Sequence, residues 1–270
     1  MTAVRIGVVQ LTSTAEVEEN LASVRTWVET AVGEGADWVA LPENFASMRR
    51  EGESIESAQD LHGSIVRFVT DLARSHGVWI LGGSFAERIP DDDRVYNTSF
   101  LARPDGELAA VYRKIHLFDV DLGPEGGGRF CESSTYRPGD EVVVADTPFG
   151  GVGLSVCYDL RFPELYRAQS SEPANFLCVP SAFAPATGRD HWEILLRARA
   201  IENQAFVIAP AQWGPHSPSR SSYGRAMIVD PWGIIRAQVG DETGLGIADC
   251  DLERLAAIRR SVPALQHRRL

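Results

Sequence analysis

Short apolar stretches rich in β-branched residues alternate along this chain with longer amphipathic stretches. The short stretches predict strands, because β-branched and aromatic side chains suit the half-buried surface of a sheet. They cover residues 4–11, 37–42, 78–85, 95–102, 107–114, 141–146, 151–156, 175–180, 205–210, 224–230 and 233–240. In the longer stretches apolar residues recur every three or four positions, which predicts helices over about 16–33, 61–76, 162–170, 190–204 and 251–260.

The order of these elements predicts mixed sheets. Polar turns at residues 103–106 and 230–233 join neighbouring strands directly and interrupt a strict strand–helix–strand order. No repeat, low-complexity tract or linker divides the chain, and 270 residues can form one large core. We therefore expect an α/β fold in a single domain that covers residues 1–270.

Composition and charge restrict the partners. The formal net charge of −11 argues against nucleic acid, which is bound by basic surfaces. No stretch approaches the roughly 20 apolar residues that a membrane span requires. The first residues are typical of a buried strand and not of an export signal, so we expect a cytoplasmic protein. The four cysteines lack C-x-x-C spacing, so we expect no metal site. Without an export signal we expect these cysteines to be free thiols in a reducing compartment.

One of these cysteines, Cys157, ends the predicted strand 151–156 and precedes Pro163, which suits the first turn of a helix. We therefore expect Cys157 in a sharp turn at the carboxyl end of a strand, where α/β sheets place their sites. There the Tyr158 backbone N–H can donate to an oxyanion, and a helix start would favour a thiolate. The alternative is a small buried apolar residue, which is our interpretation of Cys178.

Two further candidates stand at the ends of predicted strands. Glu43 follows the apolar strand 37–42 and is either a solvated loop residue or a carboxylate directed into a site. Lys114 ends the strand 107–114 and is either an edge residue with its ammonium in solvent or a fixed cation.

Glu43, Lys114 and Cys157 together form a coherent chemical unit. A thiol is mostly protonated at neutral pH, so a base and a cation are needed to make it a nucleophile. Glu43 is the candidate base, and Lys114 with the Tyr158 N–H is the candidate oxyanion binder. The scheme passes through a thioester that water hydrolyses, and it gives no role to a metal or an organic cofactor.

Motifs along nearly the whole chain resemble the nitrilase superfamily of carbon–nitrogen hydrolases. They are LPENF (residues 41–45), YRKIHLFD (112–119), GVGLSVCYDLRFPEL (151–165), PSAF (180–183), HWEILLRARAIENQAFV (191–207), SYGRAMIVDPWG (222–233) and QHRR (266–269). A lone C-Y-D sequence would be weak evidence, but the ordered set of glutamate, lysine and cysteine motifs is specific. The resemblance implies a four-layer αββα sandwich, with two sheets face to face and helices outside.

The resemblance also implies roles for individual residues. The family's Glu–Lys–Cys triad corresponds to Glu43, Lys114 and Cys157, and its second glutamate to Glu132 in RFCES. The implied substrate-binding residues, all near the nucleophile or in the PSAF region, are Tyr158, Arg161, Phe183 and Thr187. Arg161 has an equally plain alternative, an ion pair with Glu164 on the same helix start. If Arg161 binds one carboxylate of the substrate, Arg189 or Arg220 is the candidate to face its far end.

Within the superfamily the chain resembles the Nit branch, which contains deaminated glutathione amidases and omega-amidases. The expected substrate is a small linear amide that bears a carboxylate, first deaminated glutathione and alternatively a short α-keto amide. Arg189 and Asp190 stand where the family more often has Pro-Ala, close to the expected substrate pocket. The family also implies a homodimer, packed through the helix after Cys157 and through the tail 262–270. In this sequence the apolar residues that such a dimer would bury are Phe162, Leu165, Tyr166, Val262, Leu265 and Leu270.

Two other functions stay open at this point. A Cys–His thiol hydrolase or acyltransferase would pair the cysteine with His116 or His191, although a structural role suits His116 as well. A catalytically silent member of the family would serve as an interaction module, against which the intact triad residues argue.

Overall fold

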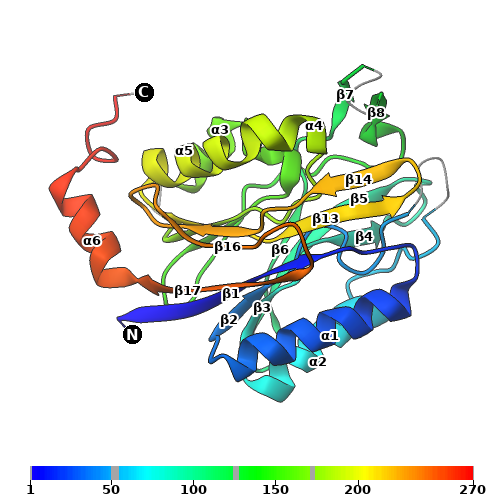
Figure 1. The fold of residues 1–270 in the computed structure, drawn as a ribbon, viewed down its shortest axis with the longest axis horizontal. Helices are drawn as coiled ribbons and strands as arrows, with labels where there is room; N and C mark the ends of the chain where they lie inside the picture. The colour runs from blue at the N-terminus through cyan, green and yellow to red at the C-terminus, as the bar shows by residue number, and fades with distance from the viewer. Residues whose placement is uncertain (1, 50–54, 124–127, 171–173, 270) are drawn as a thin grey trace.

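The computed structural model describes residues 2–49, 55–123, 128–170 and 174–269 (Figure 1). Two sheets lie face to face at its centre, and helices cover both outer faces. α1 (Val17–Gly33) and α2 (Ser64–His76) pack on the larger sheet, and α3 (Pro163–Gln169) and α5 (Glu193–Asn203) pack on the smaller one. The four-layer αββα arrangement of an α/β protein is thus confirmed.

The larger sheet is organised around β1 (Ala3–Leu11). In the described residues the strands follow the order β14 (Arg220–Tyr223), β13 (Ala211–Ser217), β1, β2 (Trp38–Ala40), β3 (Trp79–Leu81), β5 (Val95–Ala102) and β4 (Phe85–Arg88). β6 (Leu108–Arg113) adds to β5, and β17 (Gly244–Asp251) runs antiparallel to β1 from Ala3 to Gln10. β2 and β13 pair with β1 in parallel, so the sheet is mixed, as expected.

The smaller sheet carries the strand that leads to Cys157. Its order is β16 (Ile235–Gln238), β15 (Met227–Val229), β12 (Phe206–Ala209), β11 (Phe176–Cys178), β10 (Val152–Leu154) and β9 (Val144–Ala145). β10, β11 and β12 are parallel, with Leu154 opposite Cys178 and Cys178 opposite Ile208. The carboxyl ends of these strands therefore lie at one edge of the sheet.

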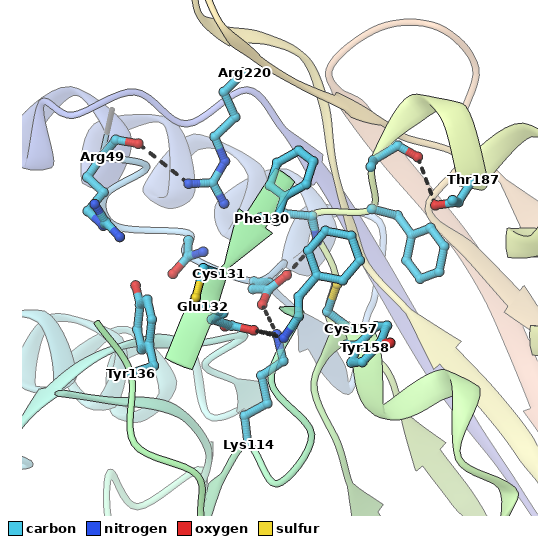
Figure 2. Close-up of a pocket in the computed structure, with 16 residues that line it drawn as sticks. Arg49, Lys114, Phe130, Cys131, Glu132, Tyr136, Cys157, Tyr158, Thr187 and Arg220 are labelled. Atoms are coloured by element: carbon cyan, nitrogen blue, oxygen red, sulfur yellow. Dashed lines mark hydrogen bonds and ion pairs between the residues drawn. The ribbon is translucent and has the colours of Figure 1, made fainter. Parts of the chain in front are cut away.

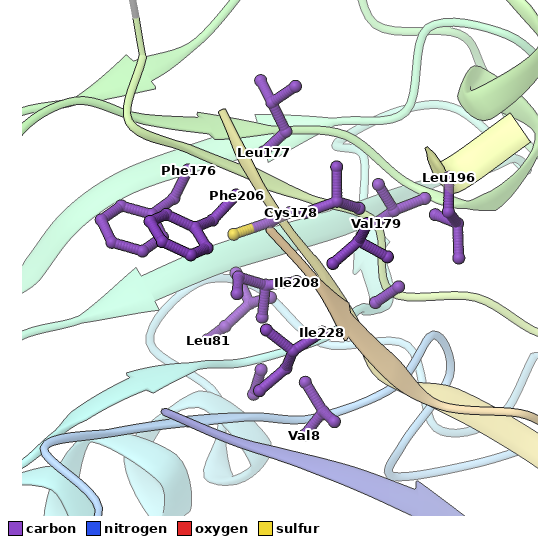
Figure 3. Close-up of a cluster of buried hydrophobic side chains, with 14 of the residues drawn as sticks. Val8, Leu81, Phe176, Leu177, Cys178, Val179, Leu196, Phe206, Ile208 and Ile228 are labelled. Carbon is purple, nitrogen blue, oxygen red and sulfur yellow. The ribbon is translucent and has the colours of Figure 1, made fainter. Parts of the chain in front are cut away.

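The alternation of side chains in β1 divides the buried apolar residues between two layers. Val4, Ile6 and Val8 belong to the core between the sheets, whereas Val9 and Leu11 belong to the core under α1 and α2. Figure 3 shows the inter-sheet core around Cys178, with Val8 and Leu81 of the larger sheet near Ile208 and Ile228 of the smaller one. Cys178 is fully buried there, as its apolar interpretation requires.

The five predicted helices are present, but β4, β17 and four strands in two hairpin-like pairs were not predicted. β7 (Asp119–Asp121) pairs with β8 (Arg129–Cys131), and β13 pairs with β14. These strands are rich in Asp, Arg, Ser and Gly, which have low strand propensity, so their pairing reflects neighbouring strands and not local preference. Residues 124–127, between β7 and β8, lie outside the described residues.

The face expected for a second subunit is partly used within the chain. Leu165 and Tyr166 of α3 are 4% and 0% exposed and belong to the chain's own core, so the prediction that they are available to a partner is wrong. Of the tail, Val262 after α6 (Leu252–Ser261) is 44% exposed, and Leu270 lies outside the described residues. No helix in the part of the chain described here is long and apolar enough to cross a bilayer.

Candidate active site

Glu43, Lys114 and Cys157 meet in one buried cluster (Figure 2). The Lys114 Nζ lies 3.2 Å from Glu43 Oε1, and the Glu43 carboxylate hydrogen-bonds the Cys157 thiol. Their exposed fractions are only 4%, 2% and 8%. Burial removes the alternatives of a solvated loop carboxylate for Glu43 and of an ammonium in solvent for Lys114.

Cys157 lies in a sharp turn three residues beyond the end of β10. Its φ is +49°, in the left-handed region that a non-glycine residue adopts only at a cost of about 1–2 kcal/mol. The short 3-10 helix η3 (Cys157–Arg161) follows directly, and the Cys157 N–H donates to the Pro180 carbonyl at 3.0 Å. The predicted strand-to-helix turn is therefore present, although α3 begins only at Pro163.

Buried polar groups hold this turn in place. The Asp159 carboxylate, which is fully buried, accepts hydrogen bonds from the Val156 N–H at 2.9 Å and the Tyr112 hydroxyl at 2.7 Å. From α5, the Arg199 guanidinium donates to the Leu160 carbonyl at 2.8 and 3.1 Å. These bonds offset the cost of the strained backbone. None of the described backbone hydrogen bonds uses the Tyr158 N–H, which leaves this donor for a ligand.

Glu132 and Asn97 complete the polar cluster. Glu132, at the start of the short helix η2 (Glu132–Ser134), lies 2.8 and 3.0 Å from Lys114 Nζ and accepts the Phe118 N–H at 2.6 Å. The Asn97 amide of β5 donates to Glu43 Oε1 at 2.9 Å and to Glu132 Oε1 at 3.3 Å. Asn97 was missed from the sequence, where the only signal was an amide within the otherwise apolar strand 95–102.

The ionisation of the cluster follows from burial and from its internal charges. Burial raises the pKa of Glu43, but the Lys114 charge and the hydrogen bonds with Cys157 and Asn97 outweigh it and hold the pKa below the ordinary 4.5. Burial lowers the pKa of Lys114, but the charges of Glu132 and Glu43 raise it well above the ordinary 10.5. Both groups are therefore charged at neutral pH.

The thiol behaves in the opposite way. Burial and the adjacent Glu43 charge raise the pKa of Cys157 well above the ordinary 9.0, and the Lys114 charge offsets this only in part. The expectation that a helix start favours a thiolate here is wrong, because burial and a neighbouring carboxylate dominate. The resting cluster holds a neutral thiol hydrogen-bonded to a carboxylate.

A cavity opens over this cluster. Its lining combines the polar cluster with aromatic and basic side chains: Glu43, Asn44, Arg49, Lys114, Phe118, Phe130, Cys131, Glu132, Tyr136, Cys157, Tyr158, Ala182, Phe183, Ala184, Thr187 and Arg220. Of the four predicted substrate-binding residues, Tyr158, Phe183 and Thr187 line it and Arg161 does not. Arg220, a candidate for the far end of the substrate, lines the cavity, whereas Arg189 does not. Arg49 and Tyr136 were missed, because residues from distant segments meet here only in the fold.

Arg161 packs behind the aromatic wall of the cavity. Its guanidinium lies 5.2 Å from the Phe183 ring centre and 5.8 Å from that of Tyr158, and 3.1 Å from His191 Nδ1. No ion pair with Glu164 occurs among the ion pairs of the described residues. Arg189 and Asp190, the departures from the family pattern, are exposed and do not line the cavity.

The two histidines proposed as rival bases have other partners. His116 Nδ1 lies 2.7 Å from Asp159 Oδ1, and its ring stacks on Phe162 with 3.7 Å between ring centres. His191 is exposed and contacts Arg161. Within the described ranges, no three His, Cys, Asp or Glu side chains are grouped as a metal site.

Comparison with known proteins assigns the chain to a family. The model of the carbon–nitrogen hydrolase family matches residues 5–260. A protein from Synechocystis named deaminated glutathione amidase is 44% identical over 262 residues, covering 96% of each chain, and its human namesake is 42% identical over 269 residues, with 98% of this chain and 82% of the human one covered.

Solved structures agree in fold over the whole chain. The NitFhit protein of C. elegans superposes with a TM-score of 0.92 at 38% identity, covering 100% of this chain and 66% of that one. Nit3 of Saccharomyces cerevisiae, a member of branch 10 of the nitrilase superfamily, superposes with a TM-score of 0.90 at 32% identity over 100% of this chain and 97% of its own. The chain described here belongs to the carbon–nitrogen hydrolase family of the nitrilase superfamily.

Proposed function

We propose that this protein is an amidase that hydrolyses a linear, carboxylate-bearing amide through a thioester on Cys157. The observation that carries the proposal is the buried contact of a neutral thiol with the ionised Glu43 carboxylate, which in turn pairs with Lys114. A thiol poised against a base is the arrangement that cysteine nucleophiles require.

Acylation begins when Cys157 Sγ attacks the amide carbonyl carbon and Glu43 takes the thiol proton. Negative charge develops on the carbonyl oxygen, for which Lys114 Nζ and the unused Tyr158 N–H are the available donors. Collapse of the tetrahedral intermediate breaks the carbon–nitrogen bond, and the departing amine takes the proton from Glu43. The thioester remains on the enzyme, and Glu43 is again ionised.

Deacylation repeats the sequence with water. Glu43 removes a proton from water as its oxygen attacks the thioester carbonyl, and the same donors stabilise the second oxyanion. Collapse expels the Cys157 sulfur, which regains its proton from Glu43, and the carboxylic acid departs. Glu132 holds the Lys114 ammonium with two contacts, so the cation stays fixed through both steps.

For the substrate we propose deaminated glutathione. Relatives that bear the name deaminated glutathione amidase are 40–44% identical over nearly the whole chain. A cavity with aromatic walls and with Arg49 and Arg220 suits a peptide-like dianion better than a neutral nitrile. The carboxylate partner expected at Arg161 is thereby reassigned to the arginines that line the cavity.

One side-by-side assay tests the substrate. Purified enzyme is given deaminated glutathione or α-ketoglutaramate, and release of α-ketoglutarate is measured for each. We expect the higher kcat/KM with deaminated glutathione, and little turnover of intact glutathione or of nitriles. The reverse preference would make the enzyme an omega-amidase, and turnover of neither amide, with no thioester trapped on Cys157, would favour the silent module.

We further propose a cytoplasmic homodimer. Ile194 (68% exposed) and Ile201 (52%) of α5 are exposed, and so is Trp232 (55%). Ile201 lies next to Gly233, which follows Trp232 and whose carbonyl accepts a bond from the Arg197 guanidinium. A clustered apolar surface of this kind supports self-association. Ile201→Glu should yield a monomer in light scattering, with Val142→Glu, at an exposed site elsewhere, as the control. A monomeric wild type at micromolar concentration contradicts the proposal.

The cytoplasmic location rests on the free thiols.

A further inference from the structure

The cavity has two chemically different ends on either side of the nucleophile. In Figure 2, Arg49, Arg220 and Tyr136 lie on one side of the Lys114–Glu132 ion pair, and Thr187 lies on the other. We call the first group, Arg49, Arg220 and Tyr136, the basic end. An amide has an acyl part and an amine part, so each end receives one of them.

The basic end is built on fixed elements. Tyr136 is only 9% exposed and packs with Ala58, Ala86 and Val95 in a small core of its own. Arg220 begins β14, and Arg49 donates to Thr135 Oγ1 at 3.1 Å, next to Tyr136. Among the ion pairs of the described residues none involves Arg220, whose guanidinium makes one long hydrogen bond, 3.5 Å, to the Arg49 carbonyl.

The negative charge at the catalytic cluster means that an anionic acyl chain needs the basic end as a counter-charge. Glu43, Glu132 and Lys114 together leave one formal negative charge at the point of attack. An acyl chain that carries a carboxylate would be repelled there unless a cation stands nearby. The pKa of the Tyr136 phenol depends on both the carboxylate and the arginines. Burial and the charge of Glu132 raise this pKa, whereas the charges of Arg49 and Arg220 lower it. The basic end is therefore within electrostatic reach of the catalytic carboxylates.

The opposite end is neutral and is formed by Ala184 and Thr187, which are both partly exposed to solvent. The chain that continues from Thr187 carries exposed Arg189 and Asp190. The amine part leaves first, when the thioester forms, and an end that is partly exposed lets it depart. The acyl part stays through both half-reactions and suits the end with the fixed side chains.

We propose that Arg220, with the Tyr136 hydroxyl beside it, binds a carboxylate on the acyl part of the substrate. The enzyme would then favour amides whose acyl part carries a carboxylate, a requirement that deaminated glutathione and α-ketoglutaramate both meet. This inference rests on the proposed amidase function, because it names the part of that substrate which Arg220 recognises. A guanidinium suits the role because it can donate two parallel hydrogen bonds to one carboxylate.

The kinetic test separates the two parts of the substrate. Wild type and Arg220→Gln are compared on α-ketoglutaramate, which has a carboxylate on the acyl part only, on N-butyrylglycine, which has one on the amine part only, and on butyramide, which has none. We expect kcat/KM to fall about 10- to 100-fold for α-ketoglutaramate, mainly through KM, and to stay within about twofold for the other two. Arg220→Lys should recover part of the loss.

A binding measurement covers substrates that turn over slowly. Glutaramate is titrated calorimetrically into Cys157→Ala and into Cys157→Ala/Arg220→Gln, and we expect the Kd to rise about 10- to 100-fold in the second. Arg236→Gln, which removes the same charge from exposed β16, is the matched control and should leave all values unchanged. Melting temperatures show whether each variant is folded.

The outcomes distinguish this inference from the function on which it rests. A loss confined to N-butyrylglycine would place Arg220 at the amine part and overturn the inference, and an equal loss on all three amides would make Arg220 structural. Unchanged glutaramate binding, or none to either variant, would also overturn it. If wild type hydrolyses no amide at all, the amidase proposal itself fails.

Discussion

Two buried cysteines, Cys178 in β11 and Cys157 just beyond the end of the neighbouring strand β10, have opposite surroundings. Cys178 lies within β11, opposite Leu154 of β10, and Cys157 lies three residues beyond Leu154 on the same strand path. Around Cys178 the side chains are apolar, as Figure 3 shows, and burial alone raises the pKa of its thiol. Around Cys157, burial is joined by a carboxylate, an ammonium and a backbone with positive φ.

The comparison shows that burial by itself does not distinguish a reactive cysteine from a structural one. Both thiols are neutral at rest, so a low resting pKa is not what marks Cys157. What differs is the presence of an ionised base in contact and of a cation where oxyanion charge would develop. Cys157 is accessible to this chemistry because the chain leaves the sheet in a turn, whereas Cys178 remains between the two sheets.

The largest expected effect comes from removing each thiol in turn. Cys157→Ala should lower kcat by about four to six orders of magnitude, because no thioester can form. Cys178→Ala should retain activity and lower the free energy of unfolding by about 1–2 kcal/mol, since it leaves a small cavity in the core. Steady-state assays and denaturant titrations of both variants check this. Substantial turnover by Cys157→Ala would end the distinction between the two cysteines.

Next come the charged neighbours that Cys178 lacks. Glu43→Gln should lower kcat by about 10²- to 10⁴-fold as the loss of a general base, and Lys114→Met by about 10²- to 10³-fold as the loss of an oxyanion donor. The double variant should lose far less than the product of these factors, because the two act on the same steps. Single-turnover kinetics on all three variants measure this, and multiplicative losses would show independent roles.

A smaller loss of activity is expected from a change at Asn97, whose amide hydrogen-bonds both Glu43 and Glu132 and fixes their positions. Asn97→Ala should lower kcat/KM by about 10- to 100-fold, because one charge-assisted bond to Glu43 and one to Glu132 disappear. Thr98→Ala, at the next position of β5, removes a bond to Glu87 away from the thiol and serves as the control. If both variants lose stability and activity in parallel, Asn97 supports the strand and not the site.

The smallest expected effect is that of pH on kcat/KM. The acid and alkaline limbs of the pH profile identify the ionisable groups that catalysis uses. The pKa of Glu43 is lowered, so kcat/KM should fall only below pH 4.5, and the raised pKa of Cys157 extends the plateau beyond 9.0. The free energy of unfolding depends on pH for the same reason. The stabilising contribution of Glu43 is present above pH 4.5 and is lost as the pH falls through the folded-state pKa of Glu43. The stabilising contribution of Lys114 is present below pH 10.5 and is lost as the pH rises through the folded-state pKa of Lys114. An acid limb at about pH 6.5 would instead implicate a histidine.

The sequence predicted those features that local pattern controls. The strand β1 and the helices α1, α2 and α5 could be recognised because their apolar residues repeat with the period of the element. β17 could not, because its glycines and aspartates have low strand propensity and it exists by pairing with β1, about 240 residues away. The turn at Cys157 was predictable from an apolar run followed by proline, both of which are local signals.

The sequence by itself determined which residue types stand at the strand ends, and through its motifs the family. Only the tertiary structure decided that Glu43 and Lys114, 71 positions apart, share a hydrogen bond beside Cys157, and that Asn97 and Glu132 join them. It also decided that Arg220 lines the cavity while Arg161 packs behind its wall. The physical reason is range: propensity and periodicity act over a few residues, whereas contact, burial and the pKa shifts that depend on them arise between segments that meet only in the folded chain.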